Sequence, residues 1–136
     1  MVTLLLLACG SKLPVTTLQV GGHPVRAEIA ATNAHRQLGL MHRDALATDS
    51  GMLFVYPDQQ IRGFWMKDTR IPLSIAFADR YGKIVRIADM KPFDTTRISS
   101  LAPAMYALEM EQGWFAAHEI TKGDTITDLP TDLTVE

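Results

Sequence analysis

The sequence predicts a single α+β domain that is mostly β: a small antiparallel, barrel-like sheet of about seven short strands, with two short helices at its edges. Short β-rich runs recur along the chain, and connections of hairpin length separate most of them. No strand–helix–strand alternation recurs, which argues against a parallel sheet with crossover helices. The length of 136 residues and the 47% apolar composition suffice for one domain with a buried core.

The first elements are two strands and a helix. β-rich runs at 13–20 and 24–30 flank Gly21-Gly22-His23, where paired glycines supply the positive φ of a tight hairpin turn. A helix is expected over 33–41, capped by Thr32 or Asn33 and weakened near its end by Gly39. Its core-facing positions are expected to be Ala34, Leu38 and Met41, and its solvent-facing positions His35, Arg36 and Gln37.

The middle of the chain predicts two short strands. Residues 51–56 form a continuous apolar run between Gly51 and Pro57, which is too short for a helix and typical of a buried strand. Residues 57–63 are expected to form a turn or loop. Residues 64–67 are expected to form the next strand, hairpinned to 51–56.

The rest of the chain predicts a hairpin, a long loop and three short closing elements. Strands at 73–79 and 83–90 flank Arg80-Tyr81-Gly82. Residues 91–104 form an irregular loop with two prolines, and loops of this length are often functional or mobile. The closing elements are a strand at 105–112, a short helix at 114–120 and a last strand at 125–129.

Charge and composition exclude several partners. The formal net charge is −2 and no basic run occurs, so no nucleic-acid partner is expected. No apolar stretch approaches the ~20 residues that a membrane-spanning helix needs. The four histidines lack metal-ligand spacing and the chain has one cysteine, so neither a metal site nor a cofactor is expected.

The N-terminal segment, residues 1–9, is interpreted as a truncated lipoprotein signal, with a single globular domain at 12–136. Leu6-Leu7-Ala8-Cys9 resembles the bacterial lipobox, in which cleavage before the cysteine leaves its thiol to carry lipid. Residues 1–3 hold no Lys or Arg, whereas a secretory signal needs positive charge there, so a plain apolar N-terminus stays an alternative. The lipobox interpretation predicts an extracytoplasmic protein of the periplasm or cell envelope, anchored to the membrane through Cys9.

A resemblance to a known family rests on four segments, HRQLGLMHRD, GMLFVY, FWMKDTRIPLSIAF and YALEMEQGW. In order and spacing they resemble the bacterial and archaeal family called domain of unknown function 192. The family pattern runs Gly-Leu-Met-x-Arg, Gly-Met-Leu-Phe, Phe-Trp-Met-Lys-Asn-Thr-x-Ile-Pro-Leu-Asp and a closing Leu-Glu. The matching positions in this chain are Gly39–Arg43, Gly51–Phe54, Phe64–Leu73 and Leu108-Glu109.

Two positions depart from the family pattern. Asp68 stands where the family usually has Asn, and this change keeps the chemistry of a turn. Ser74 stands where the family usually has Asp, which puts a carboxylate role at that position in doubt. The resemblance implies a fold and a secreted or lipoprotein setting, and it implies no established reaction.

The Phe-Trp-Met-Lys segment divides its side chains between two faces. Strand alternation places Phe64 and Met66 on one face and Trp65 and Lys67 on the other. Phe64 and Met66 are expected in the core. Trp65 and Lys67 either pack at an edge or line a concave site, where a flat aromatic ring is a favoured recognition surface.

The charged motif residues admit structural and functional interpretations. Arg43 either faces solvent at a helix end, binds a carboxylate or phosphate, or pairs with Glu109. Glu109 and Glu111 alternate with apolar residues and can both face water, but the family motif singles out Glu109. That favours a buried ion pair or a site role for Glu109. For Asp68 a structural turn is favoured.

The leading hypothesis is a non-enzymatic binding or accessory domain with a concave site for a small polar or anionic ligand. No catalytic residue is assigned, because no nucleophile motif, phosphate loop or dinucleotide fingerprint occurs. One alternative is a hydrolase of envelope carbohydrate that uses Asp68 and Glu109, and another is a purely structural motif. Methionine thioethers suit Cu(I), but methionine is more often a core residue. The expected ligand-binding residues are Met41, Arg43, Trp65, Lys67, Asp68 and Glu109.

Overall fold

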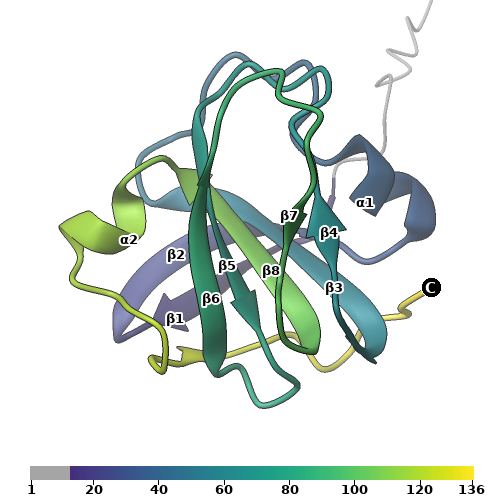
Figure 1. The fold of residues 1–136 in the computed structure, drawn as a ribbon. Helices are drawn as coiled ribbons and strands as arrows, with labels where there is room; N and C mark the ends of the chain where they lie inside the picture. The colour runs from purple at the N-terminus through teal and green to yellow at the C-terminus, as the bar shows by residue number, and fades with distance from the viewer. Residues whose placement is uncertain (1–12) are drawn as a thin grey trace, which may run out of the picture.

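The fold is a curved, half-barrel sheet with two short helices at its periphery, which confirms the predicted mostly β class (Figure 1). The computed structural model describes residues 13–136. The strands of the main sheet are β1 Val15–Val20, β2 His23–Ala30, β3 Ser50–Gln60, β5 Leu73–Ala78, β6 Ile84–Met90, β8 Ala104–Glu111 and β9 Ile126–Thr127. The other elements are α1 Asn33–Leu38, β4 Gly63–Phe64, β7 Ile98–Ser99 and α2 Trp114–Ala117.

The main sheet runs in the order β6-β5-β8-β3-β2-β1-β9, and β4 pairs separately with β7. The predicted hairpins β1–β2 and β5–β6 are both present and antiparallel. β2 and β3, in contrast, pair in parallel, because the chain returns through α1 before β3 begins. At one end the two edges of the sheet are joined where Lys83 bridges Thr125, so the curled sheet is barrel-like there.

The region around β4 differs from its prediction. The strand predicted at 64–67 is only Gly63–Phe64, and it pairs with β7 instead of residues 51–56. β3 continues through 57–60, which was predicted as a loop. Residues 51–54 already pair with β2 on one side and β8 on the other, so neither edge is open to a hairpin partner. The partner of β4 comes instead from inside the long loop predicted at 91–104.

Helix α1 presents a different face to the core from the predicted one. It ends after six residues, none of them buried. Leu38 is 53% exposed and Ala34 is also exposed, although both were predicted to face inward. Arg36 was predicted to face solvent but reaches backbone oxygens inside the fold. Gly39 ends the helix at a φ of 49°, and the turn that follows delivers Leu40 to the core in place of the helical residues.

The main sheet buries apolar side chains on both faces. On one face, Leu53 of β3 and Leu108 of β8 belong to a core that includes Phe115 of α2. On the other face, Phe54 of β3 belongs to a core that includes the segments around Leu40 and Phe64. Side chains alternate along a strand, so β8 directs residue 109 to this second face. α2 is one turn long and ends at residue 117, short of the predicted residue 120.

No helix within residues 13–136 is long and apolar enough to cross a membrane. The segment 1–9 and Cys9, which is expected to carry lipid, lie outside the described residues. The lipobox interpretation therefore stays a prediction.

Candidate functional site

A cavity of about 220 Å³ opens on the sheet face that carries Glu109. Its walls come from the end of α1 and the turn that follows, from β3, and from the chain around β4. Three of the expected ligand-binding residues line it together, namely Met41, Trp65 and Glu109. Other residues that shape it are Arg36, Leu40, Phe54, Tyr56, Phe64, Thr69 and Arg97.

Glu109 supplies the buried polar group of this cavity. It lies in the central strand β8 and is 4% exposed, with Met52 and Ile75 as its cross-strand neighbours. Within residues 13–136 no hydrogen bond or ion pair engages its carboxyl group. Every fully enclosed side-chain oxygen within residues 13–136 has a hydrogen-bond partner. Since the oxygens of Glu109 have none, they are not fully enclosed and open into the cavity. Burial raises the pKa of Glu109 from 4.5 to about 8, which leaves the group largely protonated at neutral pH.

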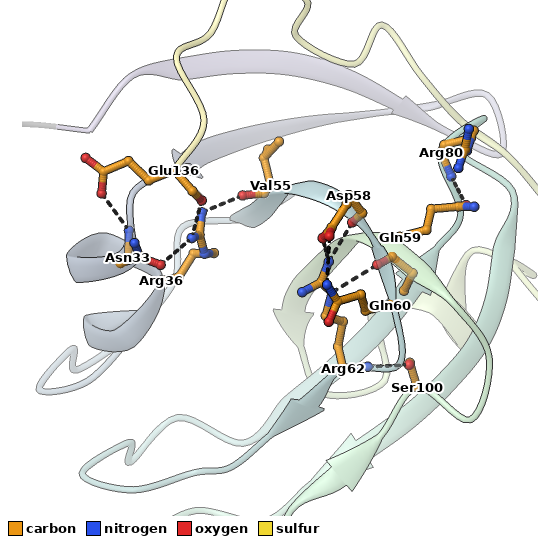
Figure 2. A network of polar contacts seen from close by, with 11 residues as sticks. Asn33, Arg36, Val55, Asp58, Gln59, Gln60, Arg62, Arg80, Ser100 and Glu136 are labelled. Atoms are coloured by element: carbon orange, nitrogen blue, oxygen red, sulfur yellow. Dashed lines mark hydrogen bonds and ion pairs between the residues drawn. The ribbon is translucent and has the colours of Figure 1, made fainter.

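Arg36 and Tyr56 form a fixed wall of the cavity. Arg36 donates to the backbone oxygen of Val55 at 2.8 Å and also to that of Glu136, so it ties α1 to β3 and to the last residues (Figure 2). The guanidinium carbon of Arg36 lies 4.8 Å from the centre of the Tyr56 ring, and that of Arg62 lies 3.8 Å away. Burial raises the pKa of the Tyr56 hydroxyl. Arg36 is held in place because both of its Nη groups already donate hydrogen bonds inside the protein.

Two cationic side chains lie close to the ring of Trp65, which lines the cavity. The guanidinium carbon of Arg97 lies 4.7 Å from the centre of the indole ring, and Nζ of Lys67 lies 5.5 Å from it. Trp65 is half-buried, whereas Lys67 and Arg97 are exposed. Arg97 contributes to the lining and Lys67 lies outside it. Phe64 and Met66 are 8% and 2% exposed, so the predicted division of this segment into two faces is confirmed.

Asp68 shapes the turn that positions Trp65 and does not line the cavity. Its φ of 52° is left-handed, a conformation that Asp and Asn tolerate better than most residues. The backbone oxygen of Asp68 accepts a hydrogen bond from the His42 N–H at 2.9 Å, which joins the first and third motifs. The Met66 N–H donates to the backbone oxygen of Asp94 at 2.7 Å, which joins the same turn to the long loop.

Arg43 lies outside the cavity and pairs with Glu28 of β2. Its Nη1 is 3.0 Å from Oε2 of Glu28, and the two side chains are 40% and 30% exposed. Of the three possibilities for Arg43, the ion pair with Glu109 is therefore wrong. The turn after α1 carries Arg43 past the cavity to a separate depression beside β2, where Glu28 is its partner.

Ser74 also lies away from the cavity. It precedes Ile75 in β5, and since Ile75 is the cross-strand neighbour of Glu109, Ser74 points to the opposite sheet face. Its hydroxyl donates to Oδ1 of Asp89 at 2.7 Å and accepts from the Gly113 N–H at 3.0 Å. The serine at this position therefore removes no residue from the cavity.

Comparison with known proteins identifies the family. The family model of domain of unknown function 192 (DUF192), described as an uncharacterized ACR, matches residues 16–127. The chain belongs to the DUF192 family. A crystal structure from Sinorhizobium meliloti 1021, provisionally labelled a transcription regulator, has 28% identity and a TM-score of 0.83, covering 86% of this chain and 95% of that one. A crystal structure of a protein of unknown function from Novosphingobium aromaticivorans DSM 12444 has 33% identity and a TM-score of 0.81, covering 84% of this chain and 85% of that one. Comparison with curated proteins gives no match.

The DUF192 motifs meet at the cavity. The first motif contributes residues 39–41, the second Phe54, the third Phe64, Trp65 and Thr69, and the last Glu109. These segments are far apart in the chain, so only the fold brings them to one place. Three further residues line the cavity although no sequence pattern indicated them, namely Arg36, Tyr56 and Arg97. For Arg97 the unusual length of its loop was the available signal.

The chemistry open to this DUF192 site is set by one acidic group. Within residues 13–136, Glu109 is the only acidic side chain that lines the cavity, since Asp68 lies outside it. A hydrolase that uses both carboxylates therefore lacks its second group here. Among the described residues no cluster of three His, Cys, Asp or Glu side chains could hold a metal ion. The site can donate or accept hydrogen bonds at Glu109 and attract negative charge through its arginines.

Proposed function

We propose that this protein is a non-enzymatic binding or accessory domain that holds a small polar or anionic ligand in the cavity at Glu109. The observation that carries the proposal is the buried Glu109 carboxyl group, which opens to the cavity and has no partner within residues 13–136. Because its oxygens open to the cavity, Glu109 takes its hydrogen bonds from whatever fills that space, water or a ligand. A small ligand with a polar group can replace the water at this position, and no protein group has to be displaced from Glu109 for it to bind.

The size and lining of the cavity favour a small molecule. Its volume of about 220 Å³ lies below the ~300–1,000 Å³ of pockets for drug-sized ligands. Aromatic side chains with a few polar groups are the usual lining of small-ligand sites, and Phe54, Phe64 and Trp65 supply them here. The net charge of −2 and the absence of a basic run give no support to nucleic-acid binding, so the label of the Sinorhizobium protein is not carried over.

A ligand screen of the full chain tests the proposal. Thermal shift and calorimetry against sugars, amino acids, nucleotides and small carboxylates should find at least one class that raises Tm and binds measurably. Trp65→Ala should then weaken that binding by at least about tenfold, because buried aromatic residues dominate binding energies. Glu111→Gln, on the same strand but exposed, is the matched control and should bind normally. If no compound in the screen shifts Tm, the cavity is structural.

We further propose that the domain works outside the cytoplasm, anchored by lipid on Cys9. The support is the Leu6-Leu7-Ala8-Cys9 sequence and its likeness to a lipobox. Expression in a bacterial host followed by membrane fractionation and intact-mass measurement tests this. Cys9→Ser should release the protein from the membrane fraction and remove the mass of the lipid. An unchanged mass and distribution would contradict the anchor.

A further inference from the structure

We propose that the ligand is a small carboxylate, and that the neutral carboxylic acid of Glu109 donates a hydrogen bond to its anionic oxygen. This inference rests on the proposed function, because it names the ligand class of the same cavity. It goes further by fixing the charge of the ligand and the protonation state that the protein needs for binding.

The charges that line the cavity favour an anion. Arg36 and Arg97 are both in the lining, and Nζ of Lys67 lies 5.5 Å from the centre of the Trp65 ring that Arg97 also contacts. When Glu109 is protonated, the lining therefore carries two positive charges and no negative one. A concave site of one sign concentrates ions of the opposite sign. The same positive charges disfavour a cationic amine.

The two arginines have different tasks. Arg36 donates to the backbone oxygens of Ala31 and Val55 at 2.8 Å each, and to Oδ1 of Asn33 at 2.8 Å, so it supplies charge to the site but few hydrogen bonds. Arg97 is exposed, and the hydrogen bond found for it within residues 13–136 is a long one of 3.5 Å to the backbone oxygen of Gly63. Arg97 can therefore turn its planar guanidinium to a carboxylate, which it matches in a bidentate way.

The hydrogen bond at Glu109 also favours a carboxylate over a neutral group. An O–H donor paired with an anionic oxygen forms a bond roughly twice as strong as a neutral pair. The acidic O–H of Glu109 has no acceptor within residues 13–136 and faces the cavity. A sugar hydroxyl would satisfy it but would leave the positive lining unused.

Binding should depend on pH through Glu109. The titratable and charged groups that line the cavity together with Glu109 are Tyr56 from β3, Arg36 from α1 and Arg97 from the long loop, while its cross-strand neighbour on β5 is the apolar Ile75. Burial raises the pKa of Glu109 to about 8. A carboxylate needs the protonated form, so its affinity should be full well below that pH and fall above it. Between about pH 6.5 and about pH 9.5 the expected loss is about thirtyfold.

Three probes of the same shape test the ligand class: benzoate, benzamide and benzamidine, which are anionic, neutral and cationic. We expect calorimetry on the full chain to rank benzoate first, with its affinity falling about thirtyfold across the stated pH range. Glu109→Gln keeps an N–H donor but cannot ionise, so it should still bind benzoate and lose the pH dependence. Arg97→Gln should weaken benzoate more than benzamide. Glu111→Gln is the control for a nearby change of charge.

The outcomes separate the two proposals. A preference for benzamidine, or an affinity for benzoate that rises with pH, overturns the carboxylate inference and leaves the cavity as a binding site. If none of the three probes binds but a sugar, nucleotide or amino acid does, the inference is again overturned and the proposed function stands. If Glu109→Gln retains the full pH dependence, Glu109 is not the proton donor. If no compound in either panel binds, both proposals are wrong.

Discussion

Replacing Glu109 by glutamine is expected to stabilise the protein, and the gain should grow as the pH rises. The pKa of Glu109 is about 8 in the folded state, against an ordinary value of 4.5. Between these values the folded state keeps a proton that the unfolded state has released, so the free energy of unfolding falls with rising pH. Each pH unit of this window corresponds to about 1.4 kcal/mol, so the penalty reaches up to about 5 kcal/mol above pH 8. Glutamine cannot ionise and avoids it.

The assay is urea unfolding of the parent, Glu109→Gln and Glu111→Gln over the range of about pH 5 to about pH 8.5. The difference in free energy of unfolding between Glu109→Gln and the parent should be smallest at the acid end and should increase by several kcal/mol at the alkaline end. Glu111 is exposed on the same strand, so Glu111→Gln should follow the parent at every pH.

A difference between Glu109→Gln and the parent that stays constant with pH would refute this reasoning. It would mean that Glu109 titrates at the same pH in the folded and unfolded states, and hence that a cation or ordered water stabilises its charge. A decrease in the difference with rising pH would mean that Glu109 is ionised and paired in the folded state, which is the opposite sign. Either result would also remove the basis for a proton donor in the cavity.

The remaining predictions concern the supports of the cavity. Gly51→Ala should lower the free energy of unfolding by about 2 kcal/mol or more, because a Cβ there would overlap a backbone oxygen of β8. Gly63→Ala should cost much less, because the nearest atom to its added Cβ is 3.6 Å away. Equal losses in urea unfolding would contradict this. Arg36→Met should cost about 1–3 kcal/mol by losing two part-buried hydrogen bonds to backbone oxygens. No measurable loss would show that these bonds do not hold the wall. Ser74→Asp should destabilise the protein at neutral pH, because it places a second carboxylate beside Asp89. Adding Asp89→Asn should restore the lost stability. A double-mutant cycle that shows no coupling between the two positions would contradict this.

The hairpins of the fold could be predicted from sequence because their signals are local. Gly21 and Gly22 adopt φ values of 53° and 83°, as the turn between β1 and β2 requires. The pairing of β3 was not local. Its partners, β2 in parallel and β8 antiparallel, depend on which strands the curled sheet brings together. An apolar run such as 51–56 predicts a strand that is buried on both faces, but it does not indicate which strands will pair with it.

The candidate site could be predicted only in part, for similar reasons. Glu109 was found because the family motif singles it out from Glu111, and Trp65 because strand alternation separates it from the core residues Phe64 and Met66. Arg36 was assigned to the wrong face, since the direction of a six-residue helix depends on the turn at Gly39 and not on its own periodicity. Arg43 was expected at the site because arginine suits anions, but its nearest acidic partner is Glu28. The residue type indicates which interactions a side chain can make, and its position in the fold decides which partner it contacts.

Most motif residues have a packing role that is sufficient in itself. Gly39 leaves room for the Phe54 ring, which would lie 3.3 Å from an added Cβ, and Gly51 lets β3 approach β8. Asp68 holds a left-handed turn against the backbone of the first motif. Such residues would be found in a protein whose motif served the fold alone. Glu109 is different, because burial raises its pKa to about 8 and so lowers the stability of the fold as the pH rises above its ordinary value of 4.5. The functional interpretation therefore depends on Glu109, and the unfolding experiment on this residue tests its physical basis before any ligand is known.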